Sequence, residues 1–226
     1  MHINKKTYWL QLPYLDKIFK MILLKSRIKI FNIFLENIKF NKNSKILDVG
    51  TAPILESHEN IIFHRYKWRK KITGFSNQNC NILKKKFKLN KFIKGNAKNM
   101  MLKDNSFDIS FCSATIEHVG NYKSQKKLIS ELYRVSRKFV FLTTPNRSFP
   151  VDFHTKLPLL HLLPKKIHRK ILKFFKLNYF ASEKNLNLLF SKDIIRICRD
   201  LKIIDYKIVY NKFIFLRSNI ILIIRK

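Results

Sequence analysis

Glycine is scarce in this chain, which has only four glycines in 226 residues. They stand at positions 50, 74, 95 and 120, each after a short apolar run. Residues 50–53 do not form G-x-G-x-x-G, so the glycine-rich loop that binds a pyrophosphate is excluded. Because glycine permits positive φ and close approach to the backbone, the four positions predict loops along a ligand-binding edge of a sheet.

Cysteine is also scarce, and long apolar runs are absent. Cys80, Cys112 and Cys198 lie far apart without C-x-x-C spacing. We therefore predict no disulfide framework and no zinc site, and we assign no metal ligands. A reducing compartment fits this pattern, so we expect a cytoplasmic location. The longest apolar run, at 220–224, is too short to span a bilayer, and the first residues lack the apolar core of a signal peptide.

Acidic residues are few beside the basic ones. Lys and Arg number 47 against 14 Asp and Glu, which gives a formal net charge of +33. Such a charge suits a polyanionic partner, either RNA or an anionic membrane. It also suits a compositional bias, because the chain is crowded with Lys, Asn, Ile and Phe. The spread of lysines from Lys5 to Lys226 favours the bias, and the charge alone specifies no activity.

Short apolar segments alternate with helical patterns along the chain. Strands are predicted at 45–49, 72–75, 91–94, 107–112 and 138–142, and helices at 19–40, 56–70, 79–88, 124–135 and 191–201. This alternation is typical of a mostly parallel sheet. Two last strands, at 203–210 and 213–224, are close enough in sequence to form an antiparallel hairpin. We therefore predict an α/β, Rossmann-like sheet of seven strands flanked by helices.

Two regions depart from this alternation. Residues 1–44 are predicted to form an N-terminal helical extension, which leaves 45–226 as the main domain. Residues 147–190 hold three prolines and several aromatic residues, and we interpret them as a helical cap inserted after the fifth strand. Within the cap, 157–175 is both basic and apolar. That composition suits either a lid over a pocket or a contact with a membrane surface.

Four stretches stand in order at characteristic separations. They are KILDVGTAP (45–53), KITGFS (71–76), FIKGNAKNMMLKDNSFD (92–108) and FDISFCSATIEHVG (107–120). Together they resemble the class I S-adenosylmethionine-dependent methyltransferases, in particular the small-molecule "type 11" branch. The resemblance covers 45 to about 146, and the segment at 143–166 resembles some bacterial members. It implies S-adenosyl-L-methionine as the cofactor.

The resemblance also implies where the cofactor binds. Asp48 and Gly50 end the first strand, and we expect free backbone N–H groups at a helix start just beyond them. The family commonly has acidic residues at the ends of the second and third strands. Here Ser76 and Asn96 stand in their place and can accept the same hydrogen bonds more weakly. The expected cofactor-binding set is Asp48, Gly50, Thr51, Ser76, Asn96, Ala97 and Ser113.

Polar residues after the fourth and fifth strands are candidates for the acceptor side, because ligands bind at the carboxyl ends of parallel strands. His118 and His154 are candidate general bases, since an unperturbed histidine titrates near neutrality. A purely structural role is the alternative for each. The candidate substrate-binding residues are Glu117, Asn146, Arg147 and Asp152. No N/D-P-P-Y stretch follows the fourth strand, which argues against methylation of nucleobase amines.

The sequence therefore predicts methyl transfer from S-adenosylmethionine to a small molecule or a cell-envelope precursor. One alternative is an RNA methyltransferase that uses the basic charge. The other is a binding module, associated with nucleic acid or membrane, with a vestigial cofactor site. The expected partners are a small-molecule acceptor and, through the dispersed charge, an anionic membrane or RNA, with no integral membrane segment.

Overall fold

The computed structural model describes residues 13–89 and 91–226. Its centre is a seven-stranded sheet in the order β3-β2-β1-β4-β5-β7-β6. The strands are β1 (Ile46–Val49), β2 (Ile72–Ser76), β3 (Lys91–Lys94), β4 (Phe107–Ser113), β5 (Ser136–Pro145), β6 (Tyr206–Phe213) and β7 (Leu216–Arg225). Strands β1 to β5 pair in parallel, and β7 pairs antiparallel with β5 and β6. The predicted fold class and the C-terminal hairpin are confirmed.

The strand order reverses between β1 and β4. The chain builds outward from β1 to β3 and then returns to place β4 on the other side of β1. Loops leaving the carboxyl ends of β1 and β4 therefore diverge, and such a switch point is where open α/β sheets bind ligands. The topology thus predicts a ligand site at the loops after Val49 and Ser113.

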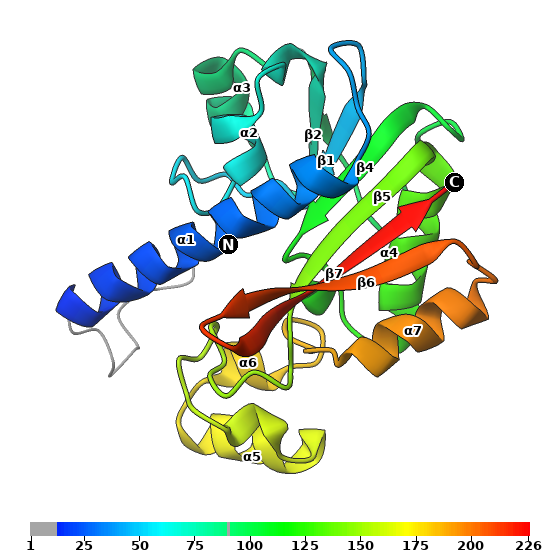
Figure 1. Cartoon of the computed structure of the whole chain (residues 1–226). Helices are drawn as coiled ribbons and strands as arrows, with labels where there is room; N and C mark the ends of the chain where they lie inside the picture. Colours follow the sequence, from blue (N-terminus) through cyan, green and yellow to red (C-terminus); the bar gives the residue numbers. More distant parts are fainter. Residues whose placement is uncertain (1–12, 90) are drawn as a thin grey trace.

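Helices cover both faces of the sheet (Figure 1). One face carries α1 (Pro13–Asn37), α2 (Ile61–Arg65) and α3 (Asn81–Phe87), and the other carries α4 (Tyr122–Val135) and α7 (Ser191–Asp200). Side chains alternate between the faces along each strand. In β5, for example, Phe141 packs with the first group and Leu142 with the second. The result is a three-layer α/β/α core.

Two local predictions are wrong. The helix expected at 56–70 shrinks to α2 and a 3-10 turn at Arg69–Lys71, and 51–60 is an irregular loop. The Asn60 side chain holds that loop, accepting from the Ala52 amide and donating to the carbonyls of Ala52 and Ile54. Gly74 lies inside β2 rather than at its end. A Cβ there would stand 2.8 Å from the Phe92 ring. Glycine is therefore needed at position 74 to avoid a clash within the sheet, and not to form a loop.

Helix α1 belongs to the core although it falls within the predicted extension. Its Phe34 is fully buried, with its ring 5.2 Å from the rings of Phe111 and Phe141 in edge-to-face geometry. Those two rings stack on each other across neighbouring strands β4 and β5. The helix is therefore fixed against the middle of the sheet.

The cap lies at the carboxyl end of β5, beside the tip of the β6–β7 hairpin (Figure 1). It contains a 3-10 turn (Leu160–Leu162), α5 (Lys165–Phe174) and α6 (Asn178–Ala181). It has a small apolar core of its own, made of Leu157, Leu172, Leu177, Phe180, Ala181, Leu186 and Leu188. The cap is therefore a packed unit that covers one end of the sheet.

The aromatic contact of α1 gives a first testable prediction. We expect Phe34→Ala to lower the free energy of unfolding by about 3–5 kcal/mol, because it leaves a cavity among packed rings. Denaturant unfolding measures this change. The matched control is Leu35→Ala, whose side chain is 41% exposed on the same helix and should change the value by about 0.5 kcal/mol or less. Equal effects of the two variants would show that α1 does not pack on the sheet in solution.

Candidate functional site

Asp48 is the buried acid at the end of β1. The Thr51 hydroxyl donates to its Oδ2 atom at 2.7 Å. Burial raises the pKa of Asp48 from 3.8 to about 7, although the Thr51 hydrogen bond acts in the opposite direction. A positively charged group beside this carboxyl would favour its ionised form. The site therefore fits a ligand that carries positive charge, as the sulfonium and ammonium groups of S-adenosylmethionine do.

Position 50 requires glycine for two reasons, its backbone conformation and a neighbouring side chain. Its φ is +92°, and a Cβ at this position would lie 1.9 Å from the Thr115 hydroxyl oxygen. The amides of Gly50 and Thr51 both donate to the Phe75 carbonyl, and no helix begins before Ile61. The expectation of free N–H groups at a helix start is therefore wrong. These contacts tie β1 to β2 and bring the loop after β4 against β1.

Ser76 ends β2 and Asn96 stands two residues after β3, and both form turns of the same kind. Ser76 Oγ accepts from the amide of Gln78 at 3.2 Å, and Asn96 Oδ1 accepts from the amide of Lys98 at 3.0 Å. Each oxygen has a second lone pair, so neither turn exhausts its acceptor capacity. Asn96 is exposed, and Ala97 beside it is half-buried. Both positions lie at the same edge of the sheet as Asp48.

Ser113 ends β4 and has a partner that the sequence did not predict. Arg27 Nη1 donates to its hydroxyl at 2.6 Å, and the Thr143 hydroxyl lies 3.1 Å away. Arg27 belongs to α1, 86 residues earlier in the chain. No local pattern marks this arginine, because its position depends on how α1 packs across the sheet. Its guanidinium places a positive charge beside the carboxyl end of β4.

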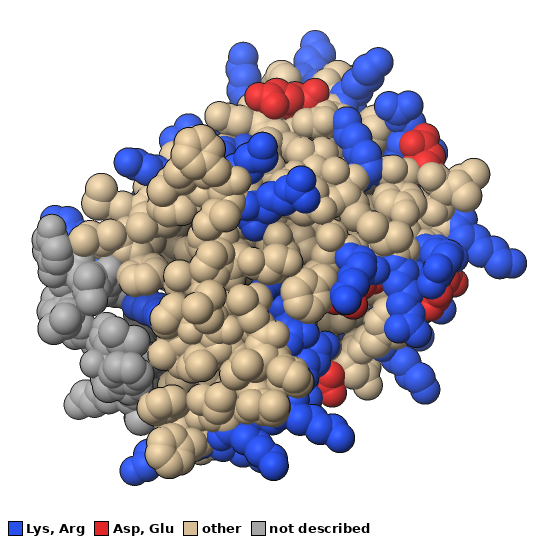
Figure 2. Space-filling model, turned by 60° about the horizontal axis from the view of Figure 1, so that its bottom comes forward, with Lys and Arg blue, Asp and Glu red and all other residues tan. Residues whose placement is uncertain are grey.

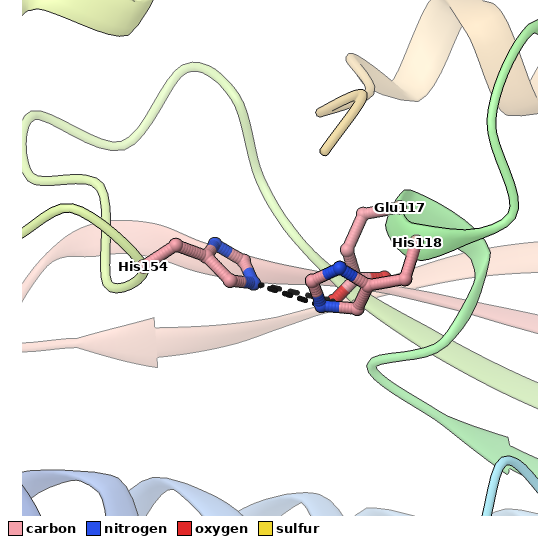
Figure 3. Close-up of side chains that lie close together, drawn as sticks. All are labelled: Glu117, His118 and His154. Carbon is pink, nitrogen blue, oxygen red and sulfur yellow. Dashed lines mark hydrogen bonds and ion pairs between the residues drawn. The ribbon is translucent and has the colours of Figure 1, made fainter. Parts of the chain in front are cut away.

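Glu117, His118 and His154 form a cluster where the loop after β4 meets the cap (Figure 3). The Nε2 atoms of the two histidines lie 3.2 Å apart. Each of these nitrogens is 4.0 Å from Glu117 Oε1. The structure thus brings together both candidate bases and one candidate substrate-binding residue.

Both histidines are held by their other ring nitrogen. His118 Nδ1 lies 2.7 Å from the Asn185 carbonyl, and His154 Nδ1 lies 3.0 Å from Asp152 Oδ1. Burial lowers the pKa of His154, but the hydrogen bond and charge of Asp152 outweigh it and raise the pKa above its ordinary value. Burial opposes ionisation of Asp152, yet its bonds to His154 and Thr155 hold its pKa far below the usual range.

Glu117 is completely buried at the base of the cluster. Its Oε2 accepts from the Thr144 hydroxyl at 3.0 Å, whereas Oε1 has no hydrogen-bond partner. The Asn187 amide donates to the Glu117 backbone carbonyl at 2.7 Å, so the end of the cap fixes the same residue. One carboxylate oxygen is therefore anchored while the other points at the histidines.

The remaining candidate substrate residues have structural partners. Arg147 is 8% exposed, and its guanidinium donates to the carbonyls of His161 and Leu163 within the cap. Asn146 is also buried, and its amide donates to the Arg217 carbonyl. The Asp152 carboxylate bonds His154 and Thr155, so it positions the His154 ring. The substrate-binding role of Asn146 and Arg147 stays a prediction, and the function proposed for the protein rests on other residues.

Comparison with known proteins agrees with this fold. Residues 62–142 match a family described as a methyltransferase domain. No curated protein matches the sequence. Solved structures match over most of the chain. Two are S-adenosylmethionine-dependent methyltransferases, one from Thermotoga maritima (TM-score 0.59, 14% identity, 92% of each chain) and one from Aquifex aeolicus (TM-score 0.59, 14% identity, 92% of this chain and 97% of that one).

A third match is magnesium protoporphyrin IX methyltransferase from Synechocystis PCC 6803, solved with bound S-adenosylhomocysteine. Its TM-score is 0.55 at 14% identity, and the match covers 90% of this chain and 83% of that one. Residues 62–142 are thus similar to a methyltransferase domain, and the chain shares the fold of S-adenosylmethionine-dependent methyltransferases.

Asp48 gives a prediction about pH. Because its folded pKa of about 7 exceeds the unfolded value of 3.8, the folded state binds more protons between these limits. Stability should therefore fall as pH rises through this window, by at most roughly 4 kcal/mol once pH exceeds 7. The Asp48→Asn side chain does not titrate. The free energy of unfolding of this variant, minus that of the original protein, should therefore increase between pH 5 and pH 8. A difference that stays constant with pH, measured by denaturant unfolding, would contradict the shift.

Proposed function

We propose that the protein methylates a small acceptor molecule whose reacting group meets the cluster of Glu117, His118 and His154. The observation that carries this proposal is the cluster itself, which combines one buried carboxylate and two oriented histidines at the carboxyl ends of β4 and β5. The cap closes over it from the other side through Asn185 and Asn187. A cluster that a small cap encloses on one side suits a compact acceptor better than a long polymer.

The cofactor side is assigned to the loops after β1, β2 and β3. We assign Asp48 to the cationic part of the cofactor, and Ser76, Asn96 and Ala97 to its sugar and base. Gly50 and Thr51 shape the loop, and Ser113 lies between the two sides. S-adenosylmethionine supplies a methyl group on a sulfonium centre that is already electrophilic. The chain therefore contributes mostly by positioning, which can supply roughly 7–11 kcal/mol of the barrier.

The chemistry of the acceptor follows from the cluster and from Arg27. A base is needed when the acceptor atom must lose a proton, as a hydroxyl or an acidic carbon does. His118 and His154 can take that proton, since both present Nε2 at the cluster (Figure 3). Arg27 also lies close enough for its charge to oppose protonation of His154. We infer an acceptor with a hydroxyl group and a nearby negative charge that pairs with Arg27.

Cofactor binding tests the assignment. Calorimetric titration should show S-adenosylhomocysteine binding that weakens about 5- to 10-fold in Ser76→Ala, as expected for one lost hydrogen bond. Asp48→Asn should weaken S-adenosylmethionine binding about 10- to 100-fold, because a charged partner is lost. The matched control is Ser106→Ala, which lies at the opposite edge of the sheet, before β4.

Two results would contradict this assignment in different ways. No heat at millimolar cofactor with the original protein would remove the proposed function. Unchanged binding in both Asp48→Asn and Ser76→Ala would place the cofactor elsewhere on the chain.

We further propose peripheral contact with an anionic membrane through the capped end. Figure 2 shows this end, where uncharged side chains fill the middle and basic ones surround them. Phe174 of α5 is 82% exposed, and Phe215 at the hairpin tip is 87% exposed. No helix among residues 13–89 and 91–226 has the length and apolar character to cross a membrane. Apolar anchors within a basic rim suit binding at the surface of anionic lipid.

Vesicle co-sedimentation tests this contact. The protein should bind vesicles rich in phosphatidylserine, less at high salt, and little to phosphatidylcholine alone. Phe174→Ser and Phe215→Ser should each weaken binding roughly tenfold or more, since each removes an exposed aromatic ring that would become buried in the lipid. The control is Ile204→Ser, a 92% exposed apolar residue at the opposite end of β6. Equal loss in all three variants would contradict a specific anchoring end.

A further inference from the structure

We propose that Glu117, His118 and His154 bind a divalent first-row transition metal ion, with Zn²⁺ as the representative. The three ligand atoms lie within 4.8 Å of one another. One carboxylate and two imidazoles form a ligand set found in catalytic zinc sites, and it also suits iron and cobalt. The three ligands come from two separate segments, the loop after β4 and the cap. The sequence therefore shows none of the short spacings of a metal site, such as C-x-x-C or H-x-x-x-H.

The first argument is the protonation of the two rings. The Asn185 carbonyl can only accept, so His118 Nδ1 carries the proton of that ring. His154 Nδ1 donates to the Asp152 carboxylate in the same way. In the neutral rings, both Nε2 atoms therefore present lone pairs to each other across 3.2 Å. Two facing lone pairs repel unless a cation lies between them.

The second argument is the spacing of the ligand atoms. Nitrogens bound at about 2.0–2.1 Å to a tetrahedral zinc ion stand roughly 3.3 Å apart. The observed Nε2 separation of 3.2 Å is close to this value. The two 4.0 Å separations to Glu117 Oε1 are longer, and rotation of the carboxylate about its anchored Oε2 can shorten them.

The third argument is the unpaired oxygen of Glu117. A fully buried carboxylate oxygen without a partner is costly, since a buried charge needs a compensating group. No lysine or arginine of the described residues pairs with Glu117, so its neighbours at Oε1 are the two histidines. A divalent ion at the centre of Figure 3 would satisfy this oxygen and both nitrogens at once.

The surroundings complete the features expected of a metal site. Metal-bound histidines characteristically donate their other N–H to a carboxylate or a carbonyl, which are the roles of Asp152 and Asn185 here. His118 is exposed, so an ion can enter from solvent. Three protein ligands leave a fourth position open. If the proposed function holds, that position suits the acceptor hydroxyl, whose proton a bound metal would acidify, and the two histidines would then act as metal ligands in place of acting as bases.

Direct metal binding tests the proposal without any methyl transfer. Chelator-treated protein is titrated with ZnCl₂ by calorimetry, and CoCl₂ binding is followed by visible absorption. We expect one tight Zn²⁺ site per chain, a cobalt spectrum of low coordination number, and much weaker binding of Mg²⁺, which prefers oxygen ligands. His118→Ala and Glu117→Gln should abolish the tight site. Asp152→Asn should weaken it about 10- to 100-fold, because it orients His154 without touching the ion.

The matched control is His58→Gln. His58 Nε2 lies 3.3 Å from Glu56 and 3.5 Å from Glu59 near the surface, so it represents adventitious binding. Its loss should leave the tight site unchanged. His118 is exposed, so His118→Ala should fold normally, and circular dichroism checks this.

Absence of a tight zinc site in the original protein would overturn the proposal. The short distance between the two histidines would then be explained by a proton that they share. Retention of the site in folded His118→Ala would overturn it as well. Loss of cofactor binding alone would contradict the proposed function and leave the metal site standing.

Discussion

The buried carboxylate of Glu117 is the constraint around which the edge at the carboxyl ends of β4 and β5 is built. Its Oε2 is tied to Thr144 of β5, and its backbone carbonyl receives the Asn187 amide from the cap. The loop that carries it also packs Thr115 against Gly50, directly after β1. One short segment therefore fixes three elements relative to one another. A displacement of Glu117 would move the loop after β1 and the cap together, so the proposed cofactor and acceptor sides are mechanically linked.

Helix α1 and the cap both reach this edge, and they come from different directions. Helix α1 crosses one face and sends Arg27 to Ser113, while the cap returns over the loop after β4 and holds His118 through Asn185. Neither contact belongs to the sheet itself. The parallel strands thus provide a rigid edge, and the regions before β1 and after β5 supply side chains that make it specific. In the proposed function, substitutions at Arg27 or Asn185 would therefore change the acceptor.

The sequence predicted the sheet well because strand and helix periods are local. The seven strands, their alternation with helices and the C-terminal hairpin all follow from short apolar runs and their spacing. The loop at 51–60 was misjudged, since its shape depends on side-chain bonds from Asn60 that leave no periodic signal. Arg27 was missed for a related reason: 86 residues separate it from Ser113.

The cluster of Glu117, His118 and His154 was predicted residue by residue but not as a unit. The strand ends indicated that the residues lie at one edge, yet the two histidines are 36 positions apart, and that separation carries no information on a 3.2 Å approach. Their meeting depends on the path of the cap, which local patterns do not determine.

The distribution of acidic residues argues that this edge is functional rather than a remnant of the fold. Only 14 acidic residues offset 47 basic ones, so each buried acid is notable. Four of those whose burial the structure describes are buried, and Glu131 is compensated by Arg134. Asp48, Glu117 and Asp152 have no lysine or arginine partner within the described chain, and all three lie at the edge formed by the carboxyl ends of the strands. Burying carboxylates without such a partner costs stability that a purely structural edge would avoid by using neutral residues. Cationic ligands would offset that cost, with the sulfonium cofactor beside Asp48 and a metal ion beside Glu117.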